Sequence, residues 1–133
     1  MATVRPLRVL VVDDEHPIAD SLVTIFRNHG FDATSVYSGY SAIEAALSVR
    51  PDVVISDVRM PGVNGLDAIL SIWRLLPSAK FILFSAQADY IDRLSRAREQ
   101  GFNFVYLHKP IPPQSLIEYL KHWAQERAVG AAG

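Results

Sequence analysis

The stretch Val9-Leu10-Val11-Val12-Asp13-Asp14-Glu15 is a short apolar run that ends abruptly in three acidic residues. A run of aliphatic residues without polar alternation is typical of a strand that is buried on both faces, as in a parallel sheet. Acidic residues directly after such a strand lie at its carboxyl end, where α/β sheets bind their ligands. This stretch therefore predicts both a class of fold and the place of a site.

Three further apolar runs have the same character, and each is bounded by polar residues or by residues that break regular structure. These runs are Val53 to Ile55, Phe81 to Phe84 and Phe104 to Leu107. A more polar stretch from Asp32 to Tyr37 alternates loosely, which suits a strand at the edge of a sheet. The sequence thus predicts five strands.

Segments with the helical spacing of apolar residues separate these runs. Their apolar stripes extend from Ile18 to Phe26, Tyr40 to Leu47, Leu66 to Leu76, Tyr90 to Ala97, and Leu116 to Trp123. Glycine or proline follows most of them, as at Gly30, Pro77 and Gly101, and these residues commonly end helices. Regular alternation of strands and helices predicts an α/β fold with a doubly wound parallel sheet that carries helices on both faces.

The composition indicates one globular domain. The chain has 133 residues, half of them apolar and a fifth charged, which suits a sizeable core and argues against intrinsic disorder. Thirteen Lys and Arg stand against fourteen Asp and Glu, so the net charge of -1 does not favour direct binding of nucleic acid. We expect the domain to cover residues 1–127 and the small-residue segment 128–133 to form a flexible tail.

The composition also excludes several kinds of site. Because the chain has no cysteine, it has no disulfide, no cysteine-rich zinc site and no thiol nucleophile. Its apolar runs are too short to cross a bilayer, and the N-terminus lacks the apolar segment and cleavage site of a signal peptide. We therefore expect a soluble cytoplasmic protein that does not associate with membranes.

Charged and polar residues follow the apolar runs. Asp13 and Asp14 come after the first, Asp57 closely follows Val53 to Ile55, Ser85 comes after Phe84, and Lys109 lies just beyond the last. In a parallel sheet these groups meet at one edge. Crowded carboxylates repel one another unless a cation neutralises them, and Mg²⁺ prefers carboxylates together with water and phosphate oxygens.

This mixture of groups points to phosphoryl chemistry. An ammonium group and a hydroxyl group that face metal-bound acids balance the charge of a phosphoryl group. An aspartate can itself be the nucleophile, which gives an aspartyl phosphate. The residues alone leave open whether Asp13, Asp14 or Asp57 takes that part.

Four pieces of the chain, in this order, resemble the response-regulator receiver domain of two-component signalling in its single-domain, chemotaxis-regulator-like form. They are residues 11–15, residues 57–65, Ser85-Ala86 and Lys109-Pro110, and the resemblance extends from about Leu7 to Trp123. It implies a flavodoxin-like fold, in which a five-stranded parallel sheet of order 2-1-3-4-5 carries five helices. It also implies a signalling switch that catalyses only its own modification and is not an enzyme for outside substrates.

The resemblance implies a phosphate acceptor and a magnesium site. Asp57 is the expected phosphoacceptor and also a ligand of Mg²⁺. Asp14 would bind the ion directly, Asp13 mainly through water, and the backbone carbonyl of Arg59 would complete the protein ligands. The phosphoryl donor would be a sensor histidine kinase or a histidine phosphotransfer protein, and hydrolysis of the aspartyl phosphate would reset the switch.

The resemblance also implies catalytic and switching residues. Ser85 would hydrogen-bond to one phosphate oxygen and Lys109 would pair with another, with a cis peptide bond between Lys109 and Pro110. Tyr106 matches an aromatic switch position, whose ring would move inward as Ser85 is drawn to the phosphate. That movement would reshape the face made by the fourth helix, the fifth strand and the fifth helix, which would bind a downstream protein or an output domain.

Some features leave alternatives open. The fourth expected helix carries many charges over a thin apolar stripe, so we expect it to be the most mobile helix, and its charges would suit a homodimer. Phe102 replaces a residue that is usually small in the family. Arg59 and Gln87 occupy positions that tune phosphoryl lifetime in relatives, and the sequence leaves their effect here open. A phosphatase of the haloacid-dehalogenase type would need an acid where Arg59 stands. A constitutive binding module would not need the acids, Ser85 and Lys109 together.

Overall fold

The computed structural model describes residues 5–60, 65–85 and 91–132, with the backbone alone for 129–132. Five strands alternate with five helices, as the sequence predicts. The strands are β1 (Arg8–Val12), β2 (Asp32–Val36), β3 (Val53–Asp57), β4 (Lys80–Ser85) and β5 (Val105–His108). The helices are α1 (His16–Asn28), α2 (Gly39–Val49), α3 (Gly65–Leu75), α4 (Ile91–Glu99) and α5 (Pro113–Ala132).

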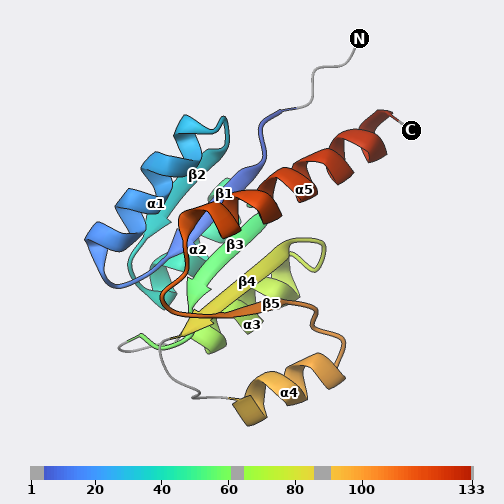
Figure 1. Cartoon of the computed structure of the whole chain (residues 1–133). Coiled ribbons are helices and arrows are strands. Elements are labelled where there is room, and N and C mark those ends of the chain that lie inside the picture. The colour runs from blue at the N-terminus through green and yellow to red at the C-terminus, as the bar shows by residue number, and fades with distance from the viewer. Residues whose placement is uncertain (1–4, 61–64, 86–90, 133) are drawn as a thin grey trace.

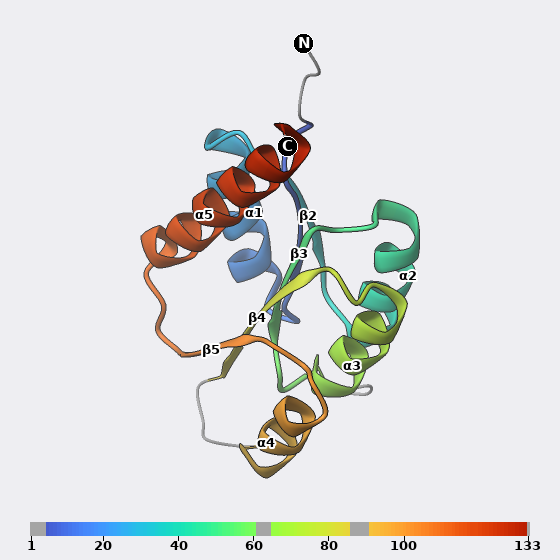
Figure 2. The same cartoon turned by 90° about the vertical axis from the view of Figure 1, so that its right-hand side faces the viewer.

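The strands form one parallel sheet in the order β2-β1-β3-β4-β5, so the expected fold class is confirmed. The helices α1 and α5 cover one face of this sheet, and α2 and α3 cover the other (Figures 1 and 2). All carboxyl ends of the strands therefore point to the same edge. The start of β1 and the end of α5 lie together at the opposite end of the molecule (Figure 1).

Two hydrophobic cores lie on the two faces of the sheet, because successive side chains of a strand alternate between them. Val11, Ile55 and Phe84 belong to the core under α1 and α5, whereas Val12 and Leu83 belong to the core under α2, α3 and α4. The same alternation continues past the ends of the strands. It places the side chains of residues 13 and 57 on the α1–α5 side and that of residue 85 on the α3–α4 side.

The helix ends follow local sequence signals. The Ser38 side chain accepts a hydrogen bond from the Ser41 N–H at the start of α2 (3.1 Å), which satisfies a backbone donor that has no partner inside the helix. Gly30 and Gly101 follow α1 and α4 with positive φ angles of 89° and 99°, a conformation that glycine adopts without strain. Both helices therefore stop where the sequence indicated.

The apolar stripe of α2 differs from the expected one. Tyr40 and Leu47, which the sequence placed on that stripe, are 67% and 56% exposed. The buried positions of α2 are Gly39, Ala42 and Ala46, whose small side chains bring the helix close to its neighbours. Helical spacing alone could not distinguish large exposed apolar residues from small buried ones.

The helix α5 ends at Ala132, so it includes most of the segment 128–133 that we expected to form a tail. Alanine-rich sequence favours helix. Near this end the Arg127 guanidinium donates a hydrogen bond to Asp52 (2.9 Å) and ties the helix to the sheet. The helix continues past this anchor rather than ending at it.

Phe102 is fully buried at the centre of an aromatic cluster on the α3–α4 side. Its ring lies 5.0 Å from those of Trp73 and Phe81 and 5.1 Å from that of Phe104, measured between ring centroids. The unusual size of this residue is thus accommodated by three other rings that join α3, β4 and the approach to β5. In the part of the chain that the structure describes, no helix is both long and apolar enough to cross a membrane.

Candidate functional site

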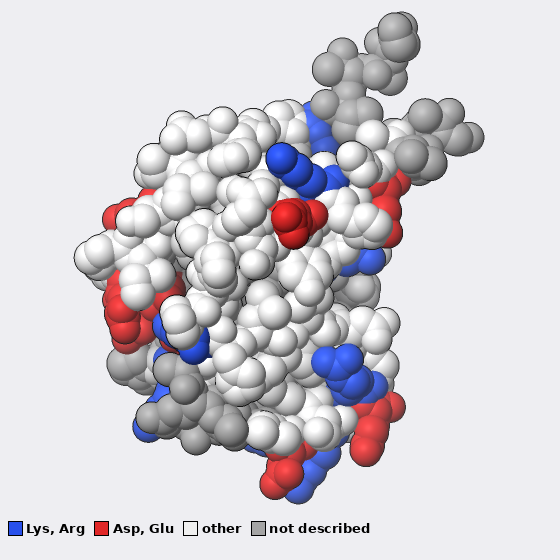
Figure 3. All heavy atoms as spheres, viewed as in Figure 1, with Lys and Arg blue, Asp and Glu red and all other residues white. Residues whose placement is uncertain are grey.

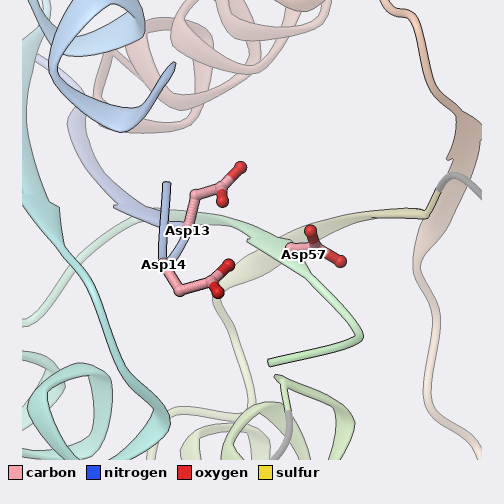
Figure 4. Close-up of side chains that lie close together, drawn as sticks. All are labelled: Asp13, Asp14 and Asp57. Atoms are coloured by element: carbon pink, nitrogen blue, oxygen red, sulfur yellow. The ribbon is translucent and has the colours of Figure 1, made fainter. Parts of the chain in front are cut away.

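Three carboxylates converge at the carboxyl edge of the sheet (Figure 4). Asp13 and Asp14 follow β1, and Asp57 ends the neighbouring strand β3. One carboxylate oxygen from each lies within 4.8 Å of the other two, a spacing that could hold a metal ion. The structure thus brings together the three acids that the sequence placed at this edge.

Asp13 is the most deeply buried of the three, with no exposed surface. Its Oδ1 accepts a hydrogen bond from the Glu15 N–H (3.0 Å), but Oδ2 accepts none from any described residue and lies 3.6 Å from the Lys109 ammonium. Burial raises the pKa of this carboxyl, and the nearby charges of Asp57 and Glu15 add to the rise. The Glu15 N–H and Lys109 only partly offset it.

Asp57 is better supplied with hydrogen-bond donors. Its Oδ1 accepts from the Arg59 N–H (3.0 Å) and its Oδ2 from the Lys109 ammonium (2.8 Å). The buried Ser56 hydroxyl donates to the Asp57 main-chain carbonyl (2.9 Å). A Cβ atom at Gly65 would lie 1.7 Å from that same carbonyl oxygen, so the start of α3 can approach Asp57 only as glycine.

Lys109 reaches the acids from the segment after β5. Its backbone N–H donates to the Ser85 carbonyl (3.0 Å), and the Lys109-Pro110 peptide bond is cis, as the resemblance implied. Burial lowers the pKa of the ammonium, but the hydrogen bond to Asp57 and the charges of Asp57 and Asp13 outweigh this effect and raise the pKa. The ammonium therefore stays charged beside the carboxylates.

Ser85 and Tyr106 lie on the α3–α4 side of the same edge. Ser85 ends β4 and is buried, and Tyr106 is a half-buried residue of β5 whose ring meets that of His108 edge-on at 5.2 Å. Tyr106 also borders a cavity of about 300 Å³ between α4 and β5, together with Leu94 and Phe104. Gln87, Asp89 and residues 61–64 lie outside the described residues.

Two of the arginines on α4 have partners within the domain. Arg93 forms an ion pair with Asp67 of α3, and Arg98 lies over the Phe104 ring at 4.2 Å and donates to the Phe104 carbonyl (3.2 Å). The charges on this helix are therefore not all available to a second protein. The expected homodimer stays a prediction.

The donor set of the edge suits a hard divalent cation. It offers three carboxylates, of which Asp14 is exposed, and the buried Oδ2 of Asp13 accepts no hydrogen bond from the residues that the structure describes. Magnesium binds few protein carboxylates and keeps places for water and phosphate oxygens. The residues present therefore fit such an ion.

An apolar groove of about 720 Å³ borders the acidic edge. Side chains of α1, such as Ile18 and Leu22, form one side, and Pro110 and Ile111 form the other, with Phe84 and Lys109 also lining the groove. Atoms of uncharged residues cover most of the face that α1 and α5 present (Figure 3). The charged site thus opens beside a surface of a different character.

The sequence pattern did not predict that Ser56, Phe84 and the close contact of Gly65 contribute to this site. Gly65 belongs to a stretch that the resemblance included, but its approach to the Asp57 carbonyl depends on how α3 packs. Phe84 ends an apolar run that predicts a buried strand, and Ser56 carries no sequence signal of its own. Residues 57 and 84 lie side by side because of the register between β3 and β4, which the sequence pattern did not reveal.

Comparison with known proteins agrees with this geometry. The family model of the response regulator receiver domain matches residues 9–121. The chain belongs to this family. Receiver domains accept phosphoryl groups in two-component signalling, where response regulators work with histidine kinases and downstream targets.

Two curated relatives illustrate two kinds of response regulator. The DNA-binding response regulator MtrA of Mycobacterium tuberculosis is 33% identical over 117 residues, which are 88% of this chain and 50% of that protein. The chemotaxis protein CheY of Thermotoga maritima is 32% identical over 114 residues, which are 85% of this chain and 93% of that protein. The chain therefore spans about half the length of MtrA and nearly all of CheY.

Solved structures share the fold. A CheY-like receiver domain protein from Methanospirillum hungatei has a TM-score of 0.83 at 22% identity and covers 94% of this chain and 98% of its own. The N-terminal domain of a Wolinella succinogenes protein has a TM-score of 0.82 at 29% identity, covering 93% and 98%. The architecture is thus that of CheY-like receiver domains.

Proposed function

We propose that Asp57 accepts a phosphoryl group from the phosphohistidine of a sensor histidine kinase or phosphotransfer protein. Asp13, Asp14, Asp57 and the Arg59 carbonyl would hold Mg²⁺. The observation that carries the proposal is the position of the Lys109 ammonium, 2.8 Å from Asp57 Oδ2 and 3.6 Å from the buried Asp13 Oδ2. This edge combines a possible nucleophile, the Lys109 ammonium and a carboxylate oxygen that accepts no hydrogen bond from any described residue. Such a combination suits phosphoryl transfer better than simple binding.

The chain's own residues orient the nucleophile. The Arg59 N–H holds Oδ1, and the Ser56 hydroxyl and the close approach of Gly65 hold the main chain of Asp57. An Asp57 carboxylate oxygen forms a bond to phosphorus while the bond from phosphorus to the histidine nitrogen breaks and its electron pair stays with the imidazole. Mg²⁺, when bound, neutralises the carboxylates and the phosphoryl oxygens.

Lys109 and Ser85 would stabilise the transferred group. The Lys109 ammonium exchanges its contact with Asp57 for one with a phosphoryl oxygen, and Ser85 donates a hydrogen bond to another. Both residues start from the ends of adjacent strands, and the backbone bond from Lys109 to Ser85 links them. This link keeps the two residues close together at the carboxyl edge, where one phosphoryl group would engage both.

The phosphorylated state would be read out on the face of α4, β5 and α5. Tyr106 lies on β5 beside the cavity under α4, so a shift of Ser85 toward the phosphate would free space for its ring. The partner would be a downstream protein, an output domain or a second copy of the chain, with no direct contact to nucleic acid. Hydrolysis of the aspartyl phosphate by water would return the domain to its first state.

Intact mass after incubation with acetyl phosphate tests the proposal. We expect one phosphoryl adduct that requires Mg²⁺ and is absent from Asp57→Asn. Asp52→Asn is the matched control, because Asp52 precedes the same strand but lies at its other end, and this variant should still form the adduct. No adduct in the wild type, together with no binding of beryllofluoride, would contradict the proposal.

A further inference from the structure

Phe84 lies between the strand that carries the nucleophile and the strand that leads to the cation. In the sheet register Phe84 pairs with Asp57 on β3 and with Leu107 on β5. Residues in register on adjacent parallel strands project from the same face of the sheet. Lys109, two residues beyond Leu107, must therefore extend across β4 to reach Asp57, and the Phe84 side chain lies in that path.

The ring meets the ammonium in a favourable geometry. The Lys109 Nζ lies over the Phe84 ring, 5.1 Å from its centroid. This distance falls within the range of cation–π attraction, about 6 Å, in which the negative face of the ring attracts the cation. Lys109 is therefore held from two sides, by carboxylate oxygens and by a ring face.

The ring itself has little freedom. Phe84 is 3% exposed and belongs to the core that includes Leu116 and Ile117 of α5. The ring packs against these core residues on part of its surface, which restricts its rotamer, and it borders the groove beside α1 on another part. It therefore presents a fixed surface to a lysine whose long side chain would otherwise sample many conformers.

We infer that Phe84 is a positioning residue for phosphoryl transfer, whose ring face holds the Lys109 ammonium across β4 between Asp57 and Asp13. The inference rests on the proposed function, in which Lys109 stabilises the phosphoryl group. It adds a residue from the core to the groups that arrange the site. The ring acts through Lys109 and does not touch the phosphate.

Fluorination of the ring separates its electrostatic role from its bulk. Each fluorine withdraws electrons from the ring face and weakens cation–π attraction, while the shape changes little. We would incorporate phenylalanine with one, two and three fluorines at position 84 and measure phosphorylation by acetyl phosphate. The rate should fall stepwise, by about two- to five-fold over the series, which corresponds to the range for a partly exposed cation–π pair.

The same series at Phe81 is the matched control. Phe81 is equally buried on β4, but it packs against Phe102 on the other face of the sheet. Fluorination there should leave the phosphorylation rate and the melting temperature nearly unchanged. A fall in rate at Phe81 equal to that at Phe84 would show that fluorine acts on the fold rather than on Lys109, and would overturn the inference.

Nuclear magnetic resonance of Lys109 gives a readout that needs no phosphorylation. The ring current of Phe84 should shift the protons next to the Lys109 ammonium upfield, and Phe84→Leu should remove this shift. If these protons show no ring-current shift, or if the rate does not change across the Phe84 series, the inference is wrong. If the wild type neither forms an adduct nor binds beryllofluoride, the proposed function fails, and the Lys109 resonances alone then decide whether the ring lies against the ammonium.

Discussion

Asp52 and Asp13 lie at opposite ends of the same sheet and have opposite surroundings. Asp52 precedes β3, and its carboxylate accepts two hydrogen bonds from the Arg5 guanidinium (2.8 and 3.0 Å), one from the Arg8 N–H (2.8 Å) and one from Arg127 (2.9 Å). Asp13 follows β1 and accepts one hydrogen bond, and its Oδ2 has no hydrogen bond from the described residues. Hydrogen bonds from described residues therefore satisfy Asp52 at the amino end of the sheet but leave one oxygen of Asp13 at the carboxyl end without a donor.

The pKa values express this difference. Burial acts to raise the pKa of Asp52, but hydrogen bonds from Arg5 and Arg8 and the charges of Arg5 and Arg127 outweigh it and lower the pKa below its ordinary value. Burial raises the pKa of Asp13, and its partners do not compensate. Arginines thus compensate the buried acid at the amino end of the sheet, whereas the buried acid at the carboxyl end is only partly compensated, and it lies in the site where we propose that a cation binds.

Gly65→Ala, at the carboxyl end of the sheet, should lower the stability of the protein more than the other variants. The new Cβ would collide with the Asp57 carbonyl oxygen, so the main chain of the nucleophile or of α3 must move, at a cost of about 3 kcal/mol in the free energy of unfolding. Gly30→Ala is the control near the amino end. Nothing lies within 4 Å of its new Cβ, and its positive φ angle should cost about 1 kcal/mol. Urea unfolding measures both, and equal costs would contradict the account.

Asp52→Asn should destabilise the amino end. It removes the charge that Arg127 and Arg5 neutralise, and because the side chain keeps 21% exposure we expect a loss of about 2 kcal/mol, less than for a fully buried pair. Asp32→Asn, at an exposed aspartate that begins β2, is the control and should change stability little. Hydrogen exchange should also quicken near Arg127. A variant as stable as the wild type would show that the cluster contributes nothing.

The contributions of Asp13 and Asp52 to the stability of the folded protein should change in opposite directions as pH falls. As pH falls toward the ordinary aspartate value of 3.8, the raised pKa of Asp13 means that the folded protein takes up a proton first, so this residue's contribution to stability rises. As pH falls below that value, Asp52 gains its proton in the unfolded chain first, so its contribution is lost. Melting curves in metal-free buffer measure both effects. Asp13→Asn should lack the rise in stability that Asp13 gives as pH falls, and Asp52→Asn should lack the loss of stability that Asp52 gives at still lower pH.

The smallest effect is expected at α4, away from both acids. Arg93→Gln removes an ion pair with Asp67 whose side chains are 41% and 47% exposed, so the global stability should fall by less than about 1 kcal/mol. Only Leu94 and Ala97 of α4 are buried, whereas α3 buries five residues. Amide exchange in α4 should therefore be the fastest among the helices described here, and faster still in the variant. Slower exchange in α4 than in α3 would contradict this expectation.

The sequence predicted the features that depend on local pattern. Apolar runs and helical stripes indicated all ten elements, and parallel strands implied that Asp13, Asp57 and Lys109 would meet. Contacts between residues far apart in the chain were not predictable in this way. The cluster at Asp52 joins residues 47 and 75 positions apart, and each of them has the appearance of an ordinary surface residue in the sequence.

The sequence pattern also did not predict how large side chains pack and how deeply they are buried. Phe102 was recognised as unusual, but its burial among three other rings depends on how α3, β4 and β5 pack together. The anchor of α5 at Arg127 was likewise not predictable, because its partner Asp52 is far away in the sequence. Phe84 belongs to an apolar run, which predicts only its burial. Its contact with the Lys109 ammonium became visible in the structure.

The most direct test compares the thermal stability of three proteins with and without Mg²⁺. The wild type should gain about 1.4 kcal/mol at a magnesium concentration near ten times Kd. Asp13→Asn should be more stable than the wild type without the ion and should gain little from it, while Asp52→Asn should be less stable and gain as much as the wild type. If Asp13→Asn is destabilised without the ion, or responds to it as the wild type does, the carboxyl end is not an unbalanced cation site.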